Sequence, residues 1–311
     1  MTPWFTSASN RRRYLVGVSG GADSIALLHL LVEHGFHNLA VCHLDHRLRG
    51  KASTEDARFV EKTAKQLGLP FELGRTDVEA LSRANGCSLE TAGREARHAF
   101  FANCAKTHRC PRVLLAHHAD DRAETALWNL LRGSHGVKSI RPEQTIRANG
   151  RTLELIRPLL GLRRNELRDY LTQRGIAWRE DATNAEGIAI RNRLRLEALP
   201  LLENIAGRDI VPALLRATDA SLDQEAITTW ALNQAKVIDP QGRLHLPALR
   251  ALPEAMQRGA IHRYLSDHRI PDLDRDLLDR ALALLDPASP AALNLPGGHH
   301  LRRRAGRMVV M

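Results

Sequence analysis

The sequence is poor in lysine, in aromatic residues and in cysteine motifs. Only 6 of its 45 basic residues are lysines, and Phe, Trp and Tyr make up 4% of the chain. The cysteines stand apart with no Cys-x-x-Cys pair, which argues against a zinc or cluster site and fits the reduced thiols of a cytoplasm. The four are Cys42, Cys87, Cys104 and Cys110.

Two further absences concern membranes and secretion. No apolar stretch approaches the roughly 20 residues that span a bilayer, so we expect no membrane partner. The first ten residues lack a basic leader followed by an apolar segment, so we expect no signal peptide. Together with the cysteine usage, these absences predict a cytoplasmic location.

Arginine, by contrast, is abundant. The formal net charge is +10, a balance typical of proteins that bind a polyanion. Arginine suits forked contacts to phosphates and stacking on bases. A GC-rich genome would explain arginine in place of lysine, but it would not explain the net positive excess. Nucleic acid is therefore the expected class of partner.

Apolar runs typical of buried strands alternate with helical patterns through the first half of the chain. This alternation predicts parallel strands with helical crossovers, hence an α/β fold with a doubly wound sheet. Ligands of such sheets bind at the carboxyl ends of the strands. The expected strands are 14–18, 39–43, 70–73, 112–116 and 153–156, and the expected helices between them are 54–67, 89–104 and 119–131.

The second half has a weaker strand signal. With 311 residues, the chain is long enough for about two domains. We expect a catalytic domain over residues 1–205, a helical linker over 206–240 and a small C-terminal domain over 241–311. Helices are predicted at 195–202, 211–235, 253–266 and 275–285, and a terminal hairpin at 292–301 and 307–310.

The most informative segment follows the first predicted strand. Glycines there permit backbone angles closed to other residues, and the exposed N–H groups of the turn and of the next helix form an anion site. The two serines add hydroxyl donors, and the aspartate can hold a Mg²⁺ that accompanies a nucleotide. The alternative is an ordinary glycine turn with a helix cap. The segment is Ser19, Gly20, Gly21, Ala22, Asp23 and Ser24.

A second polar cluster, His117-His-Ala-Asp-Asp-Arg-Ala-Glu-Thr125, follows the fourth predicted strand. The helix dipole alone favours acidic residues at a helix start, but two histidines beside two carboxylates exceed what capping requires. The carboxylates can hold an ammonium group, bind Mg²⁺ or accept a proton from an attacking amine. A histidine among them can stabilise charge on a transferring phosphoryl group.

Three groups of arginines are candidates for contacts with RNA or phosphate. Residues 141–195 contain twelve arginines, no lysine and seven acidic residues, and Trp178 lies among them. A basic helix near a tryptophan can hold a nucleic acid backbone and stack a splayed base. Solvated helix faces are the alternative in each case. The groups are Arg47 with Arg49, Arg94 with Arg97, and Arg191 with Arg193 and Arg195.

These motifs resemble those of a known family. The segment 19–24 is similar to the pyrophosphate loop (PP-loop) of the N-type ATP pyrophosphatases, and it lacks the Gly-Lys-Ser/Thr ending of kinase P-loops. In their order along the chain, the further blocks resemble bacterial tRNA(Ile)-lysidine synthetases over about two-thirds of the sequence. Those blocks are 43–49, 90–97, 117–125, 131–133, 180–184 and 191–195.

The resemblance implies a ligase that uses ATP and Mg²⁺. In that family ATP adenylates the wobble cytidine of a tRNA(Ile) with a CAU anticodon, and L-lysine then displaces AMP to give lysidine. It implies that residues 19–24 bind ATP, with Asp23 and Asp120 near Mg²⁺. The implied catalytic residues are His118, Asp120, Asp121, Glu124, Arg94 and Arg97, and the implied RNA contacts are Arg47, Arg49, Arg191, Arg193 and Arg195.

The sequence departs from the family at His98, where tyrosine is common, and it resembles a shorter form with one C-terminal domain. Two other classes of protein share some of these features. A tRNA 2-thiolation enzyme would have the loop, but it would need a reactive cysteine pair or cluster ligands. A non-catalytic tRNA-binding module would bind tRNA without ATP turnover. The oligomeric state stays open.

Overall fold

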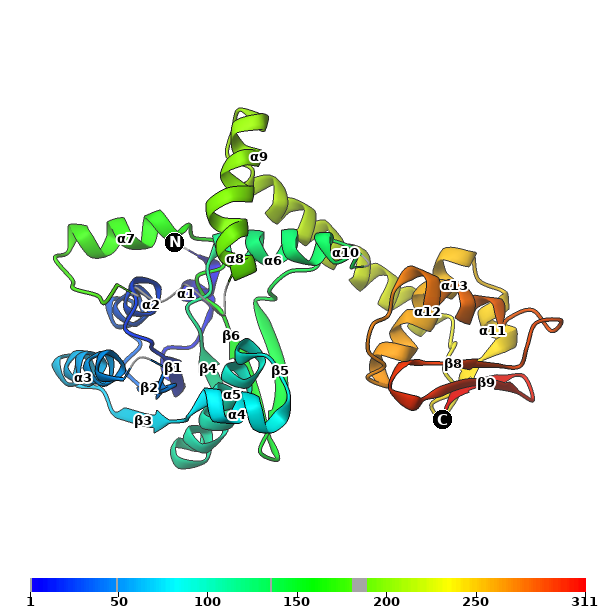
Figure 1. Ribbon diagram of the computed structural model, residues 1–311, viewed down its shortest axis with the longest axis horizontal. Coiled ribbons are helices and arrows are strands. Elements are labelled where there is room, and N and C mark those ends of the chain that lie inside the picture. Colours follow the sequence, from blue (N-terminus) through cyan, green and yellow to red (C-terminus); the bar gives the residue numbers. More distant parts are fainter. Residues whose placement is uncertain (1, 49, 135, 181–188) are drawn as a thin grey trace. The chain divides into compact units, whose positions relative to one another are not determined.

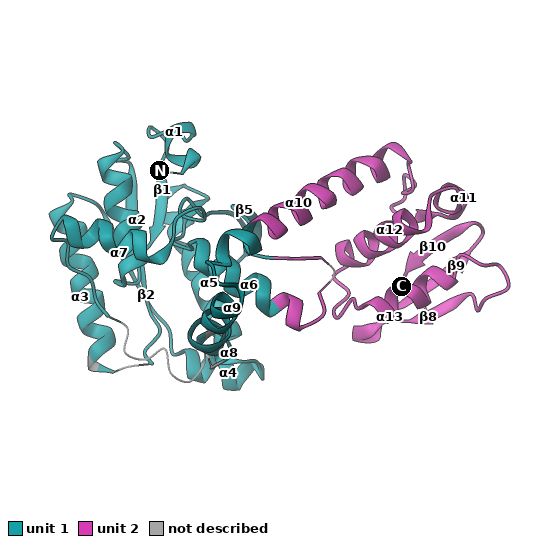
Figure 2. Cartoon of the chain, turned by 90° about the horizontal axis from the view of Figure 1, so that it is seen from above, with its two compact units in different colours: residues 1–128, 139–215 teal, residues 129–138, 216–311 magenta. Residues whose placement is uncertain are grey.

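A computed structural model of the chain describes residues 2–48, 50–134, 136–180 and 189–311. The chain divides into two compact units, residues 1–128 with 139–215 and residues 129–138 with 216–311 (Figure 2). Within the described ranges, no helix combines the length and the apolar character needed to cross a bilayer.

A six-stranded sheet forms the centre of the first unit, in the order β3-β2-β1-β4-β6-β5 (Figure 1). All neighbouring strands are parallel except β5, which pairs antiparallel with β6 at the edge of the sheet. The predicted α/β fold is therefore confirmed, with one antiparallel strand added. The strands are β1 (Tyr14–Gly17), β2 (Leu39–Asp45), β3 (Phe71–Arg75), β4 (Arg112–Leu114), β5 (Glu143–Ala148) and β6 (Arg151–Ile156).

Helices cover both faces of this sheet, because successive side chains of a buried strand point to opposite faces. Val16 and Val41 belong to a core shared with α2, α3 and α7, whereas Leu15 and Cys42 belong to a core shared with α5. These helices are α2 (Ala22–Glu33), α3 (Lys51–Gln66), α5 (Leu89–His108) and α7 (Arg164–Gln173).

The remaining elements of the first unit flank the sheet or follow it. A π-helix, η1, lies between two short helices and begins at Leu194. The long helix α10 begins in the first unit and ends in the second. These elements are α1 (Pro3–Ser7), α4 (Val78–Asn85), α6 (Ala119–Leu131), α8 (Ala189–Arg193), η1 (Leu194–Ala198), α9 (Leu199–Ala206) and α10 (Val211–Gln234).

The second unit has its own core, to which Leu244, Ile261, Leu277 and Met308 contribute. Its antiparallel sheet has the order β7-β10-β9-β8. A terminal hairpin forms between β9 and β10, but the predicted first strand, 292–301, is divided into β8, a short 3-10 helix and the start of β9. Its elements are β7 (Leu244–His245), α11 (Leu246–Arg250), α12 (Glu254–Asp267), α13 (Arg275–Ala283), β8 (Ala292–Asn294), η2 (Pro296–Gly298), β9 (His300–Arg304) and β10 (Arg307–Val310).

Candidate functional site

The loop between β1 and α2 is held in shape by one of its own serines. The Ser24 hydroxyl accepts hydrogen bonds from the backbone N–H groups of Ser19 and Gly20, both at 3.2 Å, and donates to the Gly21 carbonyl at 2.9 Å. Gly20 has a φ of 97°, a region that side chains with a Cβ rarely adopt. Ser24 is itself buried, so it organises the loop from the inside.

Helix α2 leaves the N–H groups of its first turn without intrahelical acceptors. Its first helical bond runs from the Ile25 N–H to the Gly21 carbonyl, so the N–H groups of residues 22–24 are available to a ligand. Such groups, together with the positive end of the helix dipole, bind phosphate. The loop therefore has the geometry of an anion site.

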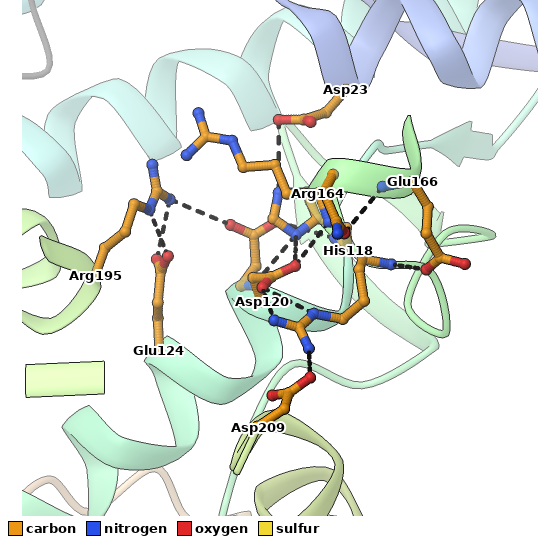
Figure 3. A network of polar contacts seen from close by, with 11 residues as sticks. Asp23, His118, Asp120, Glu124, Arg164, Glu166, Arg195 and Asp209 are labelled. Atoms are coloured by element: carbon orange, nitrogen blue, oxygen red, sulfur yellow. Dashed lines mark hydrogen bonds and ion pairs between the residues drawn. The ribbon is translucent and has the colours of Figure 1, made fainter. Parts of the chain in front are cut away.

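His118 is the centre of a cluster of carboxylates at the start of α6 (Figure 3). Its Nε2 lies 3.5 Å from Asp23 Oδ2 and 3.5 Å from Asp121 Oδ2, and its Nδ1 lies 3.5 Å from Asp120 Oδ2. The His118 residue is only 1% exposed. The sheet explains this convergence, because β1 and β4 are parallel neighbours and their carboxyl ends lead to Asp23 and His118.

Charge decides the protonation state of His118. Burial alone would lower the pKa of this imidazole, but Asp120, Asp23 and Asp121 outweigh burial and raise the pKa to about 10. The imidazole is therefore cationic at neutral pH. Its charge in turn helps to lower the pKa of Asp23 and of Asp120 against the opposing effect of burial.

Asp120 is held by two consecutive arginines. Its Oδ1 accepts from Arg163 Nε at 3.0 Å, and its Oδ2 accepts from the backbone N–H of Arg164 at 2.8 Å. Arg163 also forms an ion pair with Asp209. Since α7 begins at Arg164, after β6, a third neighbouring strand end contributes to the cluster. Asp120 is therefore fixed in place beside His118.

Glu124 lies one turn further along α6 and is occupied by Arg195. Arg195 Nε donates to Glu124 Oε1 at 2.6 Å, and Nη2 donates to Oε2 at 3.1 Å (Figure 3). Glu124 is 2% exposed, and its pKa is raised by burial and by Asp121, although the Arg195 charge opposes the rise. Asp121 is more open, with Arg195 Nη2 at 3.9 Å from its Oδ1.

The structure brings together some of the residues predicted for the site. The cluster includes Asp23, His118, Asp120, Asp121, Glu124 and Arg195.

The other predicted arginines lie outside this set of contacts. Arg193 is exposed and pairs with Glu197 at 3.1 Å. Arg94 and Arg97 are exposed on α5. The Arg97 charge adds to burial in lowering the pKa of His46 to about 4.

Two predicted residues of the RNA surface are not fully described. Arg49 and the segment 181–188 lie outside the described residues, and Arg191 is described only as part of the α8 backbone. Arg47 is exposed, and its backbone N–H donates to Asp45 Oδ1 at 2.8 Å. Their contacts with RNA stay predictions.

A magnesium ion would find a buried carboxylate oxygen without a hydrogen-bond partner here. Asp23 Oδ1 is buried and has no hydrogen-bond partner, whereas both oxygens of Asp120 already contact protein donors. In the described part of the chain, no three His, Cys, Asp or Glu side chains form a ready-made metal site. The residues present fit an ion held by Asp23 and by the phosphates of a nucleotide.

Four residues of the site were missed by the sequence reasoning. The sequence shows an excess of arginines in residues 141–195, but within this range RNA contacts were predicted only for Arg191, Arg193 and Arg195. α7 contains few apolar residues, and no sequence signal connects it to the loop after β1. The residues missed are Arg163, Arg164, Arg168 and Asp209.

Comparisons with known proteins agree with this arrangement. The model of the PP-loop domain family matches residues 3–202, and the model of the TilS substrate binding domain matches residues 244–309. Among solved structures, a U34-tRNA thiolase (NcsA) from Methanococcus maripaludis is similar in fold. Its TM-score is 0.53 at 16% identity, and the match covers 69% of this chain and 73% of the thiolase.

Three relatives are named tRNA(Ile)-lysidine synthase. The protein of Geobacter sulfurreducens is 42% identical over 72% of this chain and 47% of its own length. That of Thermus thermophilus is 36% identical over 96% of this chain and 56% of its own length. That of Chlorobaculum tepidum is 33% identical over 93% of this chain and 87% of its own length. The chain thus spans about half the length of the first two.

Proposed function

The chain belongs to the tRNA(Ile)-lysidine synthase family, and from this premise we propose that it joins L-lysine to the wobble cytidine of a CAU-anticodon tRNA(Ile) at the expense of ATP. One observation carries the proposal. An anion-binding loop and a cationic histidine among carboxylates meet at neighbouring strand ends, as a reaction that joins a nucleotide and an amine requires.

In the first step the cytidine O2 attacks the α-phosphorus of ATP. A P–O bond to that oxygen forms, the bond between the α-phosphorus and its bridging oxygen breaks, and pyrophosphate leaves. The N–H groups at the start of α2 bind the phosphates, and the His118 imidazolium stabilises negative charge that develops on the transferring phosphoryl group. Mg²⁺ would be held by Asp23 and would neutralise phosphate charge.

In the second step the ε-amine of lysine attacks C2 of the adenylated cytidine. A C–N bond forms, the C2–O2 bond breaks, and AMP leaves with that oxygen. The lysine ammonium must lose one proton before it attacks, and a carboxylate beside it is the natural acceptor. We assign Asp121 and Glu124 to lysine. The raised pKa of Glu124 suits proton transfer, and lysine would take the place of Arg195 as its partner.

The tRNA is assigned to the basic surface. The net charge of +10 favours a polyanion, and the exposed Arg193 and Arg47 are candidate phosphate contacts. We assign the C-terminal domain expected at 241–311 to tRNA binding, with residues 206–240 as the linker, and a cytoplasmic location follows from this role. The cysteines do not favour the thiolase alternative: Cys42, Cys104 and Cys110 are buried, and the partly exposed Cys87 has no Cys-x-x-Cys partner.

The test is pyrophosphate release from ATP with an unmodified CAU-anticodon tRNA(Ile) transcript, with and without lysine. Mass analysis of the wobble nucleoside accompanies the assay. We expect turnover with lysine incorporated at that cytidine. Turnover without lysine incorporation would point to another acceptor, and tRNA binding without any turnover would point to a non-catalytic module.

A further inference from the structure

Three buried polar atoms near the loop have no hydrogen-bond partner. They are Asp23 Oδ1 on α2 and the Nε atoms of Arg164 and Arg168 on α7. Buried polar atoms in folded proteins are almost always paired, so an unpaired set at one place calls for an explanation such as a bound ion. The two arginine donors match the oxygens of a phosphate chain, and the aspartate oxygen matches the metal ion that accompanies it.

The two arginines lie near the loop for reasons that the fold makes clear. Helices α2 and α7 pack together in one core, with Leu167 and Leu171 buried between them. Arg164 and Arg168 are one helical turn apart, so their side chains project from the same face of α7. Both positive charges act on the Asp23 carboxylate and help to lower its pKa.

Arg164 differs from the other arginines around the site. Arg163 is paired with Asp120 and Asp209, Arg195 with Glu124, and Arg174 at the end of α7 with Glu33. The Arg164 side chain has no ion pair and no hydrogen bond to any described residue, although its backbone N–H is fixed on Asp120 at 2.8 Å. Among the described residues, the Arg168 side chain forms one ion pair, with Glu180 at 3.4 Å.

We propose that the Arg164 guanidinium binds the pyrophosphate half of ATP, with Arg168 as a second contact from the same helix. The inference rests on the proposed function in one respect, that the loop of residues 19–24 binds ATP. A guanidinium presents two parallel N–H donors, which match two oxygens of one phosphate or of neighbouring phosphates. Arg164 therefore positions the leaving group opposite the attacking cytidine oxygen.

The experiment measures binding by calorimetry, with neither tRNA nor lysine present. The ligands are inorganic pyrophosphate with Mg²⁺, and AMP. We expect Arg164→Gln to weaken pyrophosphate binding about 10- to 100-fold, as for the loss of a charge-assisted hydrogen-bond pair, and to leave AMP binding within about twofold. Arg164→Lys keeps the positive charge but loses the two parallel N–H donors, so its affinity for pyrophosphate should lie between those of the wild type and Arg164→Gln.

Arg174→Gln is the matched control, because Arg174 follows the same helix but pairs with Glu33 and should not affect pyrophosphate. Unfolding curves establish that each variant is folded. If Arg164→Gln does not fold, the binding measurements on Arg164→Lys decide the test. Unchanged pyrophosphate affinity in a folded Arg164 variant would overturn the inference, and so would an equal loss for AMP and pyrophosphate. Wild-type protein that binds pyrophosphate but makes no lysidine would contradict the proposed function alone.

Discussion

At the scale of single residues, His118 owes its charge to its neighbours. A buried imidazole alone would be neutral, but three carboxylates raise its pKa to about 10, against 6.5 for an ordinary histidine. The folded protein therefore keeps a proton that the unfolded chain has lost above pH 6.5. This stabilisation is complete below about pH 6.5 and is lost as the pH rises through the folded pKa.

We therefore expect the free energy of unfolding to fall between pH 7 and pH 9. The slope due to His118 should approach about 1.4 kcal/mol per pH unit, the value for one proton. Urea unfolding at pH 7, 8 and 9 measures it, and His118→Gln is the control because it has no imidazole to titrate. Equal slopes for wild type and variant would show that His118 is not a cation in the fold.

Asp121 has two roles that substitution can separate. Its Oδ2 accepts from the His118 backbone N–H at 2.9 Å at the start of α6, and its charge is assigned to the lysine ammonium. Asp121→Asn keeps an oxygen for the backbone bond but removes the charge, whereas Asp121→Ala removes both. We expect both variants to raise the KM for lysine at least about tenfold, as for the loss of a charge-assisted contact.

Both variants remove one of the charges that stabilise the His118 cation. The alanine variant should lose about 1 kcal/mol more stability than the asparagine variant, the usual cost of losing a helix cap. Lysine-dependent product formation and urea unfolding give the two measurements. An unchanged lysine KM in Asp121→Ala would remove Asp121 from the lysine site, and the KM for ATP serves as the internal control.

At the scale of elements, the two glycines of the loop between β1 and α2 differ in why a side chain is unfavourable there. Gly20 has a φ of 97°, whereas Gly21 has an ordinary φ of −72° and a Cβ there would meet only the Ser19 hydroxyl at 3.5 Å. Gly20→Ala is thus expected to lower the free energy of unfolding by about 1 kcal/mol or more, the cost of a strained backbone.

Gly21→Ala should lower the free energy of unfolding by about 0.5–1 kcal/mol, because Gly21 is the N-cap of α2 and alanine is a poorer N-cap residue than glycine. It should still weaken ATP binding, since a methyl group would stand where a phosphate approaches the backbone. Urea unfolding and ATP calorimetry separate the two effects. A Gly21→Ala protein with full ATP affinity would show that the phosphates do not approach the loop at this glycine.

The same scale shows what sequence patterns can predict. Buried apolar runs such as Leu39 to His43 predict the central parallel strands, because these strands lie in the interior of the sheet. β5 was missed because most of its residues are exposed at the sheet edge, so it has no apolar alternation. α7 was missed because Leu167 and Leu171 alone are fully buried in it.

The parts of the candidate site that lie in consecutive residues could be predicted from the sequence. Residues 19–24 and 117–125 carry their chemistry in consecutive positions, so the sequence identified both. Arg163 and Arg164 act on Asp120 over more than forty positions, and only the pairing of β4 with β6 brings them there. Sequence spacing also did not reveal that Arg195 occupies Glu124.

At the scale of the whole molecule, the net charge of +10 should control its affinity for RNA. Binding to phosphates releases counterions, so the logarithm of the affinity falls linearly with the logarithm of salt concentration. With about five phosphate contacts, we expect tRNA(Ile) affinity to fall roughly 100-fold or more between 50 and 200 mM salt. Filter binding or fluorescence anisotropy over that range gives the slope.

Two exposed arginines allow this slope to be tested residue by residue. The Arg193 side chain is 73% exposed and pairs with Glu197, and the Arg83 side chain is 75% exposed and pairs with Glu79, each four residues apart on a helix. Only Arg193 is assigned to RNA, so Arg193→Gln should weaken tRNA binding and reduce the magnitude of the salt slope by about 1. Arg83→Gln should leave both unchanged. If the two variants had the same salt slope, the net positive charge of the protein would attract the tRNA as a whole, and Arg193 would form no specific contact with a phosphate.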